Sequence, residues 1–201
     1  MSDRGTCRVA AIDDAGVVTA VVADAFRDDP LWSWAMQRAD GSTDHHAVLW
    51  RVFVEGALRY SSTWIAPDSG AVSVWIPPGG TEMSDDQEAE LDRSAHEALG
   101  DGAARYFELF DRFAENHPHD EPHYYLSLLA TDRRFRGRGL GMSLLRDNLS
   151  TYDEIGVPTY LESSNPANDR RYESVGFVKR GEFHGPGDGP VVSTMWRPVG
   201  G

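Results

Sequence analysis

The sequence is poor in cysteine, in positive charge and in long apolar runs. Cys7 is the one cysteine among 201 residues, so no internal disulfide can form, which fits a reducing compartment. No apolar run approaches the ~20 residues that a membrane-spanning helix needs. Residues 2–5 do not begin the charged-then-apolar pattern of a secretion signal. We therefore expect a cytoplasmic protein with no membrane partner.

Positive charge is scarce and unevenly placed. The chain has 19 Lys and Arg against 32 Asp and Glu, a formal net charge of −13. Residues 1–132 hold 24 acidic and 9 basic side chains, whereas residues 133–201 hold 8 and 10. No broad cationic face is available to neutralise phosphates, which argues against a nucleic-acid partner. The charge balance allows one local anion site in the C-terminal third and a preference for cationic ligands elsewhere.

Short apolar runs alternate with helical patterns, which is typical of an α/β fold. Strands are expected over 7–12, 62–66, 71–76, 123–130, 159–162, 177–183 and 191–196. Helices are expected over 17–26, 47–60, 84–117 with a break at 100–102, 139–152 and 168–175. The early strands resemble a hairpin, so we expect a mixed sheet of about seven strands flanked by helices, with 123–130 buried on both faces.

Local signals set some of these boundaries. Asp13 and Asp14 are placed to cap the first helix, and Pro30 disfavours helical backbone at Asp29, which ends that helix. The acidic run over 82–101, with eight acids and one base, is expected to be a solvated helix face.

Three histidines between residues 117 and 123 are separated by acids and prolines. Pro118 and Pro122 interrupt the run, so no helical His-x-x-x-His pair is present to aim two imidazoles at one ion. We expect no metal site there.

The most informative segment is an apolar strand that ends in a glycine- and arginine-rich turn and leads into a helix. Glycines in such a turn let successive backbone N–H groups converge on an oxyanion, and the helix N-terminus adds partial positive charge. Arginines add further charge toward a phosphate. The segment comprises Leu129, Ala130, Thr131, Arg136, Gly137, Arg138, Gly139, Leu140, Gly141 and Met142. It is the local anion site that the charge balance allows.

Three kinds of glycine loop compete for this segment. A Walker loop needs Gly-Lys-Ser/Thr, and no lysine is present here. A dinucleotide loop needs Gly-x-Gly-x-x-Gly, whereas the observed spacing is Gly-x-Gly-x-Gly. The acidic residue that binds the ribose in such a loop would fall near Glu162, so spacing alone does not exclude a dinucleotide loop. The third pattern, Arg-x-x-Gly-x-Gly at Arg136, Gly139 and Gly141, resembles the coenzyme A pyrophosphate loop of the GNAT (Gcn5-related) N-acetyltransferases.

The flanking residues strengthen this resemblance. Residues 129–132 look like the end of the family's fourth strand, and residues 165–177, with Asn168, Tyr172 and a final Gly-Phe, look like its second half-motif. Residues 71–78 and 156–163 more narrowly resemble the puromycin N-acetyltransferase-like actinobacterial members. The resemblance implies a GNAT fold in a single domain over 1–201, with a coenzyme-binding core at about 123–183.

The resemblance also implies the chemistry. An acetyl group would pass from acetyl-CoA directly to a primary amine, without a metal, and the amine would belong to a small molecule such as an antibiotic or metabolite. Backbone groups of 129–131 would hold the pantetheine arm and polarise the thioester, Asn168 would bind the same arm, and Tyr172 would protonate the departing thiolate. Acetylation of protein lysines or N-termini, and a non-catalytic acyl-CoA-binding module, stay open. A homodimer is a candidate assembly, since relatives commonly form one.

The acceptor side is less specific. Glu162, at the end of a predicted strand, is a candidate general base or ammonium anchor, although such carboxylates are often merely exposed. Asp29, Trp32, Trp34 and Trp75 are weaker candidates for the acceptor pocket, because buried aromatic side chains usually belong to the core.

Overall fold

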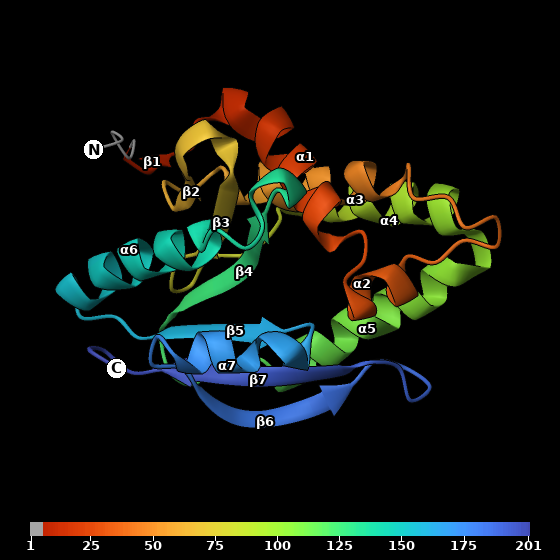
Figure 1. The fold of residues 1–201 in the computed structure, drawn as a ribbon. Helices are drawn as coiled ribbons and strands as arrows, with labels where there is room; N and C mark the ends of the chain where they lie inside the picture. The colour runs from red at the N-terminus through yellow and green to blue at the C-terminus, as the bar shows by residue number, and fades with distance from the viewer. Residues whose placement is uncertain (1–5) are drawn as a thin grey trace.

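The computed structural model describes residues 6–201, so the expectation about residues 2–5 lies outside it. Its centre is a seven-stranded mixed sheet in the order β1-β2-β3-β4-β5-β7-β6 (Figure 1). All neighbours pair antiparallel except β4 and β5, which are parallel. The strands are β1 (Arg8–Val9), β2 (Thr63–Ile65), β3 (Ala71–Ile76), β4 (Tyr124–Thr131), β5 (Thr159–Ser163), β6 (Val178–His184) and β7 (Val191–Arg197). The expected α/β fold with a mixed sheet is confirmed.

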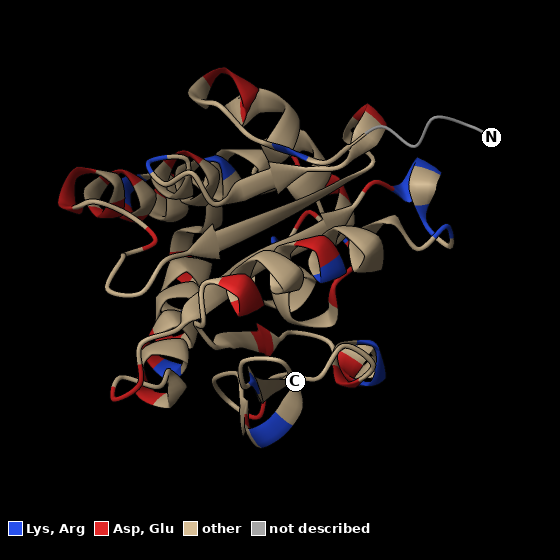
Figure 2. Ribbon diagram, turned by 90° about the vertical axis from the view of Figure 1, so that its left-hand side faces the viewer, with Lys and Arg blue, Asp and Glu red and all other residues tan. Residues whose placement is uncertain are grey.

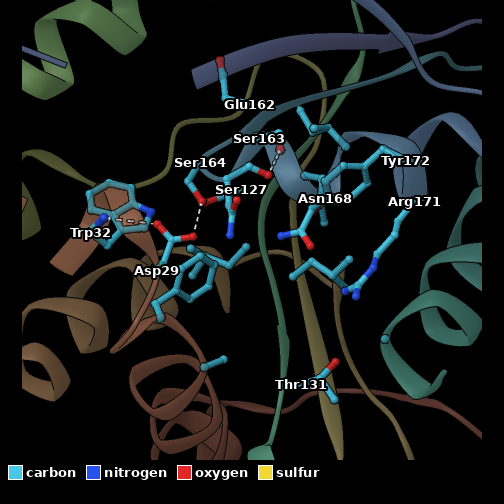
Figure 3. A pocket seen from close by; sticks show the side chains of 18 of the residues that line it. Asp29, Trp32, Ser127, Thr131, Glu162, Ser163, Ser164, Asn168, Arg171 and Tyr172 are labelled. Atoms are coloured by element: carbon cyan, nitrogen blue, oxygen red, sulfur yellow. Dashed lines mark hydrogen bonds between the residues drawn. The ribbon is translucent and has the colours of Figure 1, made fainter. Parts of the chain in front are cut away.

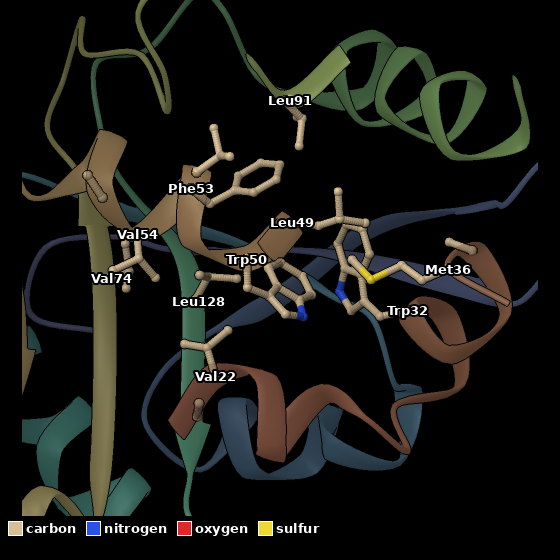
Figure 4. Packing of buried hydrophobic residues seen from close by; sticks show 14 of the residues in the cluster. Val22, Trp32, Met36, Leu49, Trp50, Phe53, Val54, Val74, Leu91 and Leu128 are labelled. Atoms are coloured by element: carbon tan, nitrogen blue, oxygen red, sulfur yellow. The ribbon is translucent and has the colours of Figure 1, made fainter. Parts of the chain in front are cut away.

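Helices cover both faces of the sheet. They are α1 (Ala15–Phe26), α2 (Pro30–Ala35), α3 (His46–Ala57), α4 (Asp85–Leu99), α5 (Ala103–Asn116), α6 (Leu140–Glu154) and α7 (Asp169–Glu173). Successive residues of β3 point to opposite faces. Val72 and Val74 therefore belong to the core under α1 and α3, where Figure 4 shows Val74 close to Val54, whereas Trp75 belongs to the core under α6. None of the described helices is long and apolar enough to cross a membrane.

The N-terminal segment differs from the sequence prediction. The Asp14 carboxylate does not cap α1; it accepts the Ala11 N–H at 2.8 Å and pairs with Arg8 at 2.7 Å. The chain makes a short 3-10 turn at Ile12–Asp14, so the strand expected over 7–12 is reduced to Arg8–Val9.

Pro30 ends α1 as predicted and also begins α2, a helix that the sequence analysis did not anticipate. Proline fits the first helical position, because the N–H group of a residue at that position has no hydrogen-bond acceptor within the helix. The Asp29 carboxylate caps the helix by accepting the N–H groups of Leu31 at 3.1 Å and Trp32 at 3.2 Å. This cap fixes Asp29 and Trp32 relative to one another.

Candidate active site

The parallel strands β4 and β5 pair over only three residues each. Their ladder ends at Leu126 and Leu161, after which β4 continues beside β3 and β5 continues beside β7. Figure 1 shows the two strands diverging beyond this point. The prediction that β4 is buried on both faces is wrong, because alternate side chains from Tyr125 to Thr131 are partly exposed along the opening. The opening leaves β4 backbone groups available to a ligand.

A cavity of about 670 Å³ occupies this opening. Figure 3 shows Tyr172, Asn168 and Arg171 on one side of it, and Asp29 and Trp32 on the other. Residues of the glycine loop and of β4 and β5 line it, as do the aromatic side chains Phe26, Trp32, Trp50, Phe53, Phe110 and Phe113. The cavity therefore has a glycine-rich end and an aromatic end.

The glycine loop forms a tight cradle at the first end. Gly137 and Gly139 have φ angles of +79° and +75°, a region that glycine adopts without strain. A Cβ on Gly141 would lie 2.5 Å from the Thr131 Oγ1, so β4 and α6 approach closely there. No side chain caps α6, whose first N–H groups are therefore available to an anion. These features fit the pyrophosphate of a coenzyme.

The arginines of this segment have different roles. Arg136 lines the cavity and donates to the Ala25 carbonyl at 3.0 Å. Arg138 stacks over Phe135 at 5.3 Å and does not line the cavity. Arg133 pairs with Asp24 and Asp28. Figure 2 shows the loop ahead of α6 as largely blue, against red segments spread over much of the ribbon. The local excess of positive charge thus lies beside the cradle.

Most of the predicted coenzyme residues meet in this cavity. Leu129, Thr131, Gly137, Gly139, Leu140, Gly141 and Met142 line it together with Arg136 and Asn168. Ala130 does not, because alternation along β4 directs its side chain into the core. Asn168 precedes α7 but makes no capping hydrogen bond, so its amide is available to a ligand.

Tyr172 lies on α7 and lines the same cavity. Burial, with smaller contributions from the nearby carboxylates of Asp29 and Asp169, raises the pKa of its phenol to about 12. The phenol therefore keeps its proton at neutral pH and can donate it.

Only two of the four predicted acceptor-pocket residues line the cavity. Asp29 and Trp32 do, whereas Trp75 is fully buried on the α6 side, where its indole N–H donates to Asn148 at 3.0 Å. Trp34 packs instead against the loop at Gly185 and stacks with Arg105 at 5.1 Å. The predictions for Trp75 and Trp34 are thus corrected, because the first completes the core and the second covers a loop.

Glu162 reaches the cavity from β5, and its side chain is only 1% exposed. Its Oε1 lies 3.3 Å from His117 Nδ1. Its Oε2 is buried and has no hydrogen-bond partner in the part of the chain that the structure describes. Among residues 6–201, no group of three or more His, Cys, Asp and Glu side chains is arranged to hold a metal ion.

Glu82 is a site residue that the sequence analysis missed. It was assigned to a solvated helix face, but it precedes α4 and lines the cavity, where the Ser127 hydroxyl of β4 donates to its carboxylate. Burial raises its pKa to about 7, with a smaller contribution from the charge of Glu162, and the Ser127 hydrogen bond opposes the shift. The signal available in the sequence was Ser84, a typical N-cap residue, which places the start of the helix after Glu82.

Comparisons with known proteins agree with this geometry. Residues 84–177 match the model of the acetyltransferase (GNAT) family. An uncharacterized N-acetyltransferase of Schizosaccharomyces pombe is 26% identical over 79% of this chain and 68% of its own length.

Solved structures share the fold across nearly the whole chain. A Corynebacterium glutamicum structure of a "histone acetyltransferase HPA2 and related acetyltransferase" is 24% identical, with a TM-score of 0.67, and covers 98% of this chain and 97% of its own. Arylalkylamine N-acetyltransferase 2 of Aedes aegypti is 15% identical, also with a TM-score of 0.67, and covers 96% and 98%. The chain is thus similar to the acetyltransferase (GNAT) family over residues 84–177, and it shares the fold of these solved structures.

Proposed function

We propose that this protein transfers an acetyl group from acetyl-CoA to the primary amine of a small molecule. The observation that carries the proposal is one cavity that joins the glycine cradle to buried carboxylates through the opening between β4 and β5. A single domain with its coenzyme-binding core at about residues 123–183, a cytoplasmic location and a homodimer belong to the same proposal.

On the coenzyme side, the chain supplies hydrogen-bond donors and a proton. The N–H groups at the start of α6 bind the pyrophosphate, with Arg136 beside them. Asn168 binds the pantetheine arm, and the Leu129 N–H donates to the thioester carbonyl as negative charge develops on its oxygen. Tyr172 gives its proton to the sulfur as the carbon–sulfur bond breaks.

On the acceptor side, a base removes the ammonium proton so that the nitrogen lone pair can form the new carbon–nitrogen bond. Glu82 is our candidate, because a base works best when its pKa lies near the working pH, and the pKa of Glu82 is raised to about 7. Glu162, with its unpartnered buried oxygen, holds the ammonium group.

The aromatic end favours an acceptor that joins an apolar ring to its amine. Trp32, Phe110 and Phe113 line this end, and Trp32 and Phe113 stack with ring centroids 5.9 Å apart. An arylalkylamine N-acetyltransferase with the same fold supports such an acceptor. The narrower resemblance to puromycin N-acetyltransferases, and with it an antibiotic acceptor, stays a prediction.

The test combines coenzyme binding with turnover. We expect acetyl-CoA to raise the unfolding temperature and free thiol to appear with aryl-alkyl amines, more slowly with polyamines and with lysine peptides. Stabilisation without thiol release would favour a binding module, and release with peptides alone would favour a protein acetyltransferase.

Replacing Tyr172 by Phe tests the proton donor. We expect kcat to fall roughly 10²-fold or more, the usual range for a lost general acid, with acetyl-CoA affinity unchanged. Tyr124→Phe is the matched control, because Tyr124 stacks on Tyr152 at 4.0 Å and does not line the cavity. Turnover near wild type in Tyr172→Phe would remove Tyr172 from the reaction.

A further inference from the structure

Two histidines extend the hydrogen bonding of Glu162 away from the cavity. Glu162 Oε1 lies 3.3 Å from His117 Nδ1, and His117 Nε2 lies 3.2 Å from His123 Nε2. His123 Nδ1 lies 2.7 Å from the carbonyl oxygen of Glu121. His123 is 8% exposed, whereas the His117 side chain is 27% exposed and is the member that reaches solvent.

Two neutral imidazole rings do not carry enough protons to make every hydrogen bond in the series from the Glu121 carbonyl to the Glu162 carboxylate. A backbone carbonyl at one end and a carboxylate at the other can only accept hydrogen bonds. The three contacts between them each need one proton, and two neutral imidazoles carry only one N–H each. Whichever tautomers are chosen, one contact is then left with two facing lone pairs. One additional proton satisfies all three contacts.

We propose that His117 and His123 together hold three ring protons, with the extra positive charge on His117, and that this pair keeps Glu162 ionised as the anchor for the acceptor's ammonium group. The role of the anchor rests on the function proposed above, but the proton count does not. His117 and His123 are positioning residues in this scheme, since they act on the acceptor through Glu162.

Burial decides which ring carries the charge. It lowers the pKa of His123, so the cation is disfavoured there. His117 is more exposed and is in contact with the Glu162 carboxylate, so the charge is better placed on His117. His123 then donates from Nδ1 to the Glu121 carbonyl and accepts at Nε2 from His117.

Aromatic neighbours fix the orientation of both rings. The His117 ring meets Tyr125 and Tyr160 edge to face at 4.9 and 5.1 Å, and the His123 ring meets Trp196 at 5.3 Å. Burial and the nearby Glu162 carboxylate raise the pKa of both tyrosines, so their phenols stay neutral. The other titratable and charged groups around Glu162 and the two histidines are Glu82, His119, Glu121 and Arg180.

The second oxygen of Glu162 makes the arrangement useful. Its Oε2 is buried without a partner among the described residues, and Glu162 lines the cavity. An ammonium N–H is the donor that would satisfy this oxygen, and a charged acceptor makes that hydrogen bond stronger. Because the imidazolium holds Glu162 in its charged form, Glu82 is left to take up the proton.

The proton count can be measured on the unmodified protein without any ligand. In protein labelled with ¹⁵N-histidine at pH 7.5, we expect His117 to be protonated on both ring nitrogens and His123 on Nδ1 only. Glu162→Gln should return His117 to one ring proton, whereas Glu121→Gln, the matched control, should not, since only its backbone carbonyl takes part. A His117 ring with one proton in the wild-type protein would overturn the proposal.

Kinetics test the role of the pair. For His117→Gln we expect KM for the amine to rise about tenfold, as for a weakened charge-assisted hydrogen bond, with a smaller change in kcat and unchanged acetyl-CoA affinity. An unchanged KM would refute the anchoring role. If no amine is acetylated but the protons are placed as expected, the proposed function fails while the histidine pair stands. If turnover is normal but His117 is neutral, the proposed function stands and the histidine pair fails.

Discussion

Replacing Glu82 by Gln has an effect on stability whose sign follows from the structure. Burial raises the pKa of this carboxyl from 4.5 to about 7 in the folded protein. The folded state therefore binds the proton more tightly than the unfolded state does. The resulting stability is fully present below pH 4.5 and is lost as the pH rises through 7. At 1.36 kcal/mol per pKa unit, the total loss is about 3 kcal/mol.

Glu82→Gln removes this loss, because glutamine stays neutral and can still accept the Ser127 hydroxyl. We expect the free energy of unfolding of the variant, relative to wild type, to increase by about 2–3 kcal/mol between pH 5 and pH 8.5. Urea denaturation of both proteins at the two pH values measures it. Glu88→Gln, on an exposed part of α4, is the control for the loss of one negative charge. Equal differences at the two pH values would refute the burial argument.

The same variant tests the proposed base. In the wild-type protein, kcat/KM should rise with pH through about 7 as Glu82 loses its proton. In Glu82→Gln that rise should disappear, and the rate at pH 8 should fall roughly 10²–10⁴-fold. A variant that is stabilised at high pH yet keeps the wild-type rate would leave Glu82 a buried acid without a catalytic role.

Two glycine substitutions test close approaches around the cavity. Gly141→Ala places a Cβ 2.5 Å from the Thr131 Oγ1, so the start of α6 or the Thr131 side chain must move; we expect acetyl-CoA affinity, measured by calorimetry, to fall about tenfold. Gly56→Ala places a Cβ against the backbone carbonyl of Glu82, so we expect unfolding free energy to fall by about 1–3 kcal/mol and kcat/KM to fall with it. Gly16→Ala in α1 is the control for both, since no atom lies within 4 Å of the added Cβ. Wild-type affinity in the first variant, or a full rate in the second, would show that these contacts do not position the site.

The glycine cradle between β4 and α6 could be predicted because residues that are consecutive in the sequence form it. A strand end, a glycine turn and a helix N-terminus follow one another from Leu129 to Met142, and their conformations depend mostly on local preferences. Asn168 and Tyr172, on the short segment after β5, were predicted from the resemblance of residues 165–177 to the family's second half-motif, and they line the same cavity.

The acceptor side could not be predicted because packing between distant segments forms it. Glu82 stands two residues before the Ser84 cap of α4, so it was grouped with the acidic residues of that helix and expected on its solvated face. Its actual place depends on Gly56, which lets its backbone approach α3, and on Ser127, 45 residues further along the chain. Trp75 was misassigned because alternation along β3 places its side chain on the α6 face of the sheet, where its indole N–H donates to Asn148.

Three of the four carboxylates that line the cavity, Asp29, Glu82 and Glu162, differ in the acceptor positions they leave open, and this difference separates their roles. Asp29 uses Oδ1 for two helix N–H groups and Oδ2 for the Ser164 hydroxyl at 2.8 Å, so it is committed to holding α2 in place. Glu162 has one oxygen against His117 and one oxygen without a partner in the described chain, which suits an anchor for a cation. Glu82 accepts one hydroxyl, and burial raises its pKa to about 7, so it is the carboxylate that can take up a proton near neutral pH.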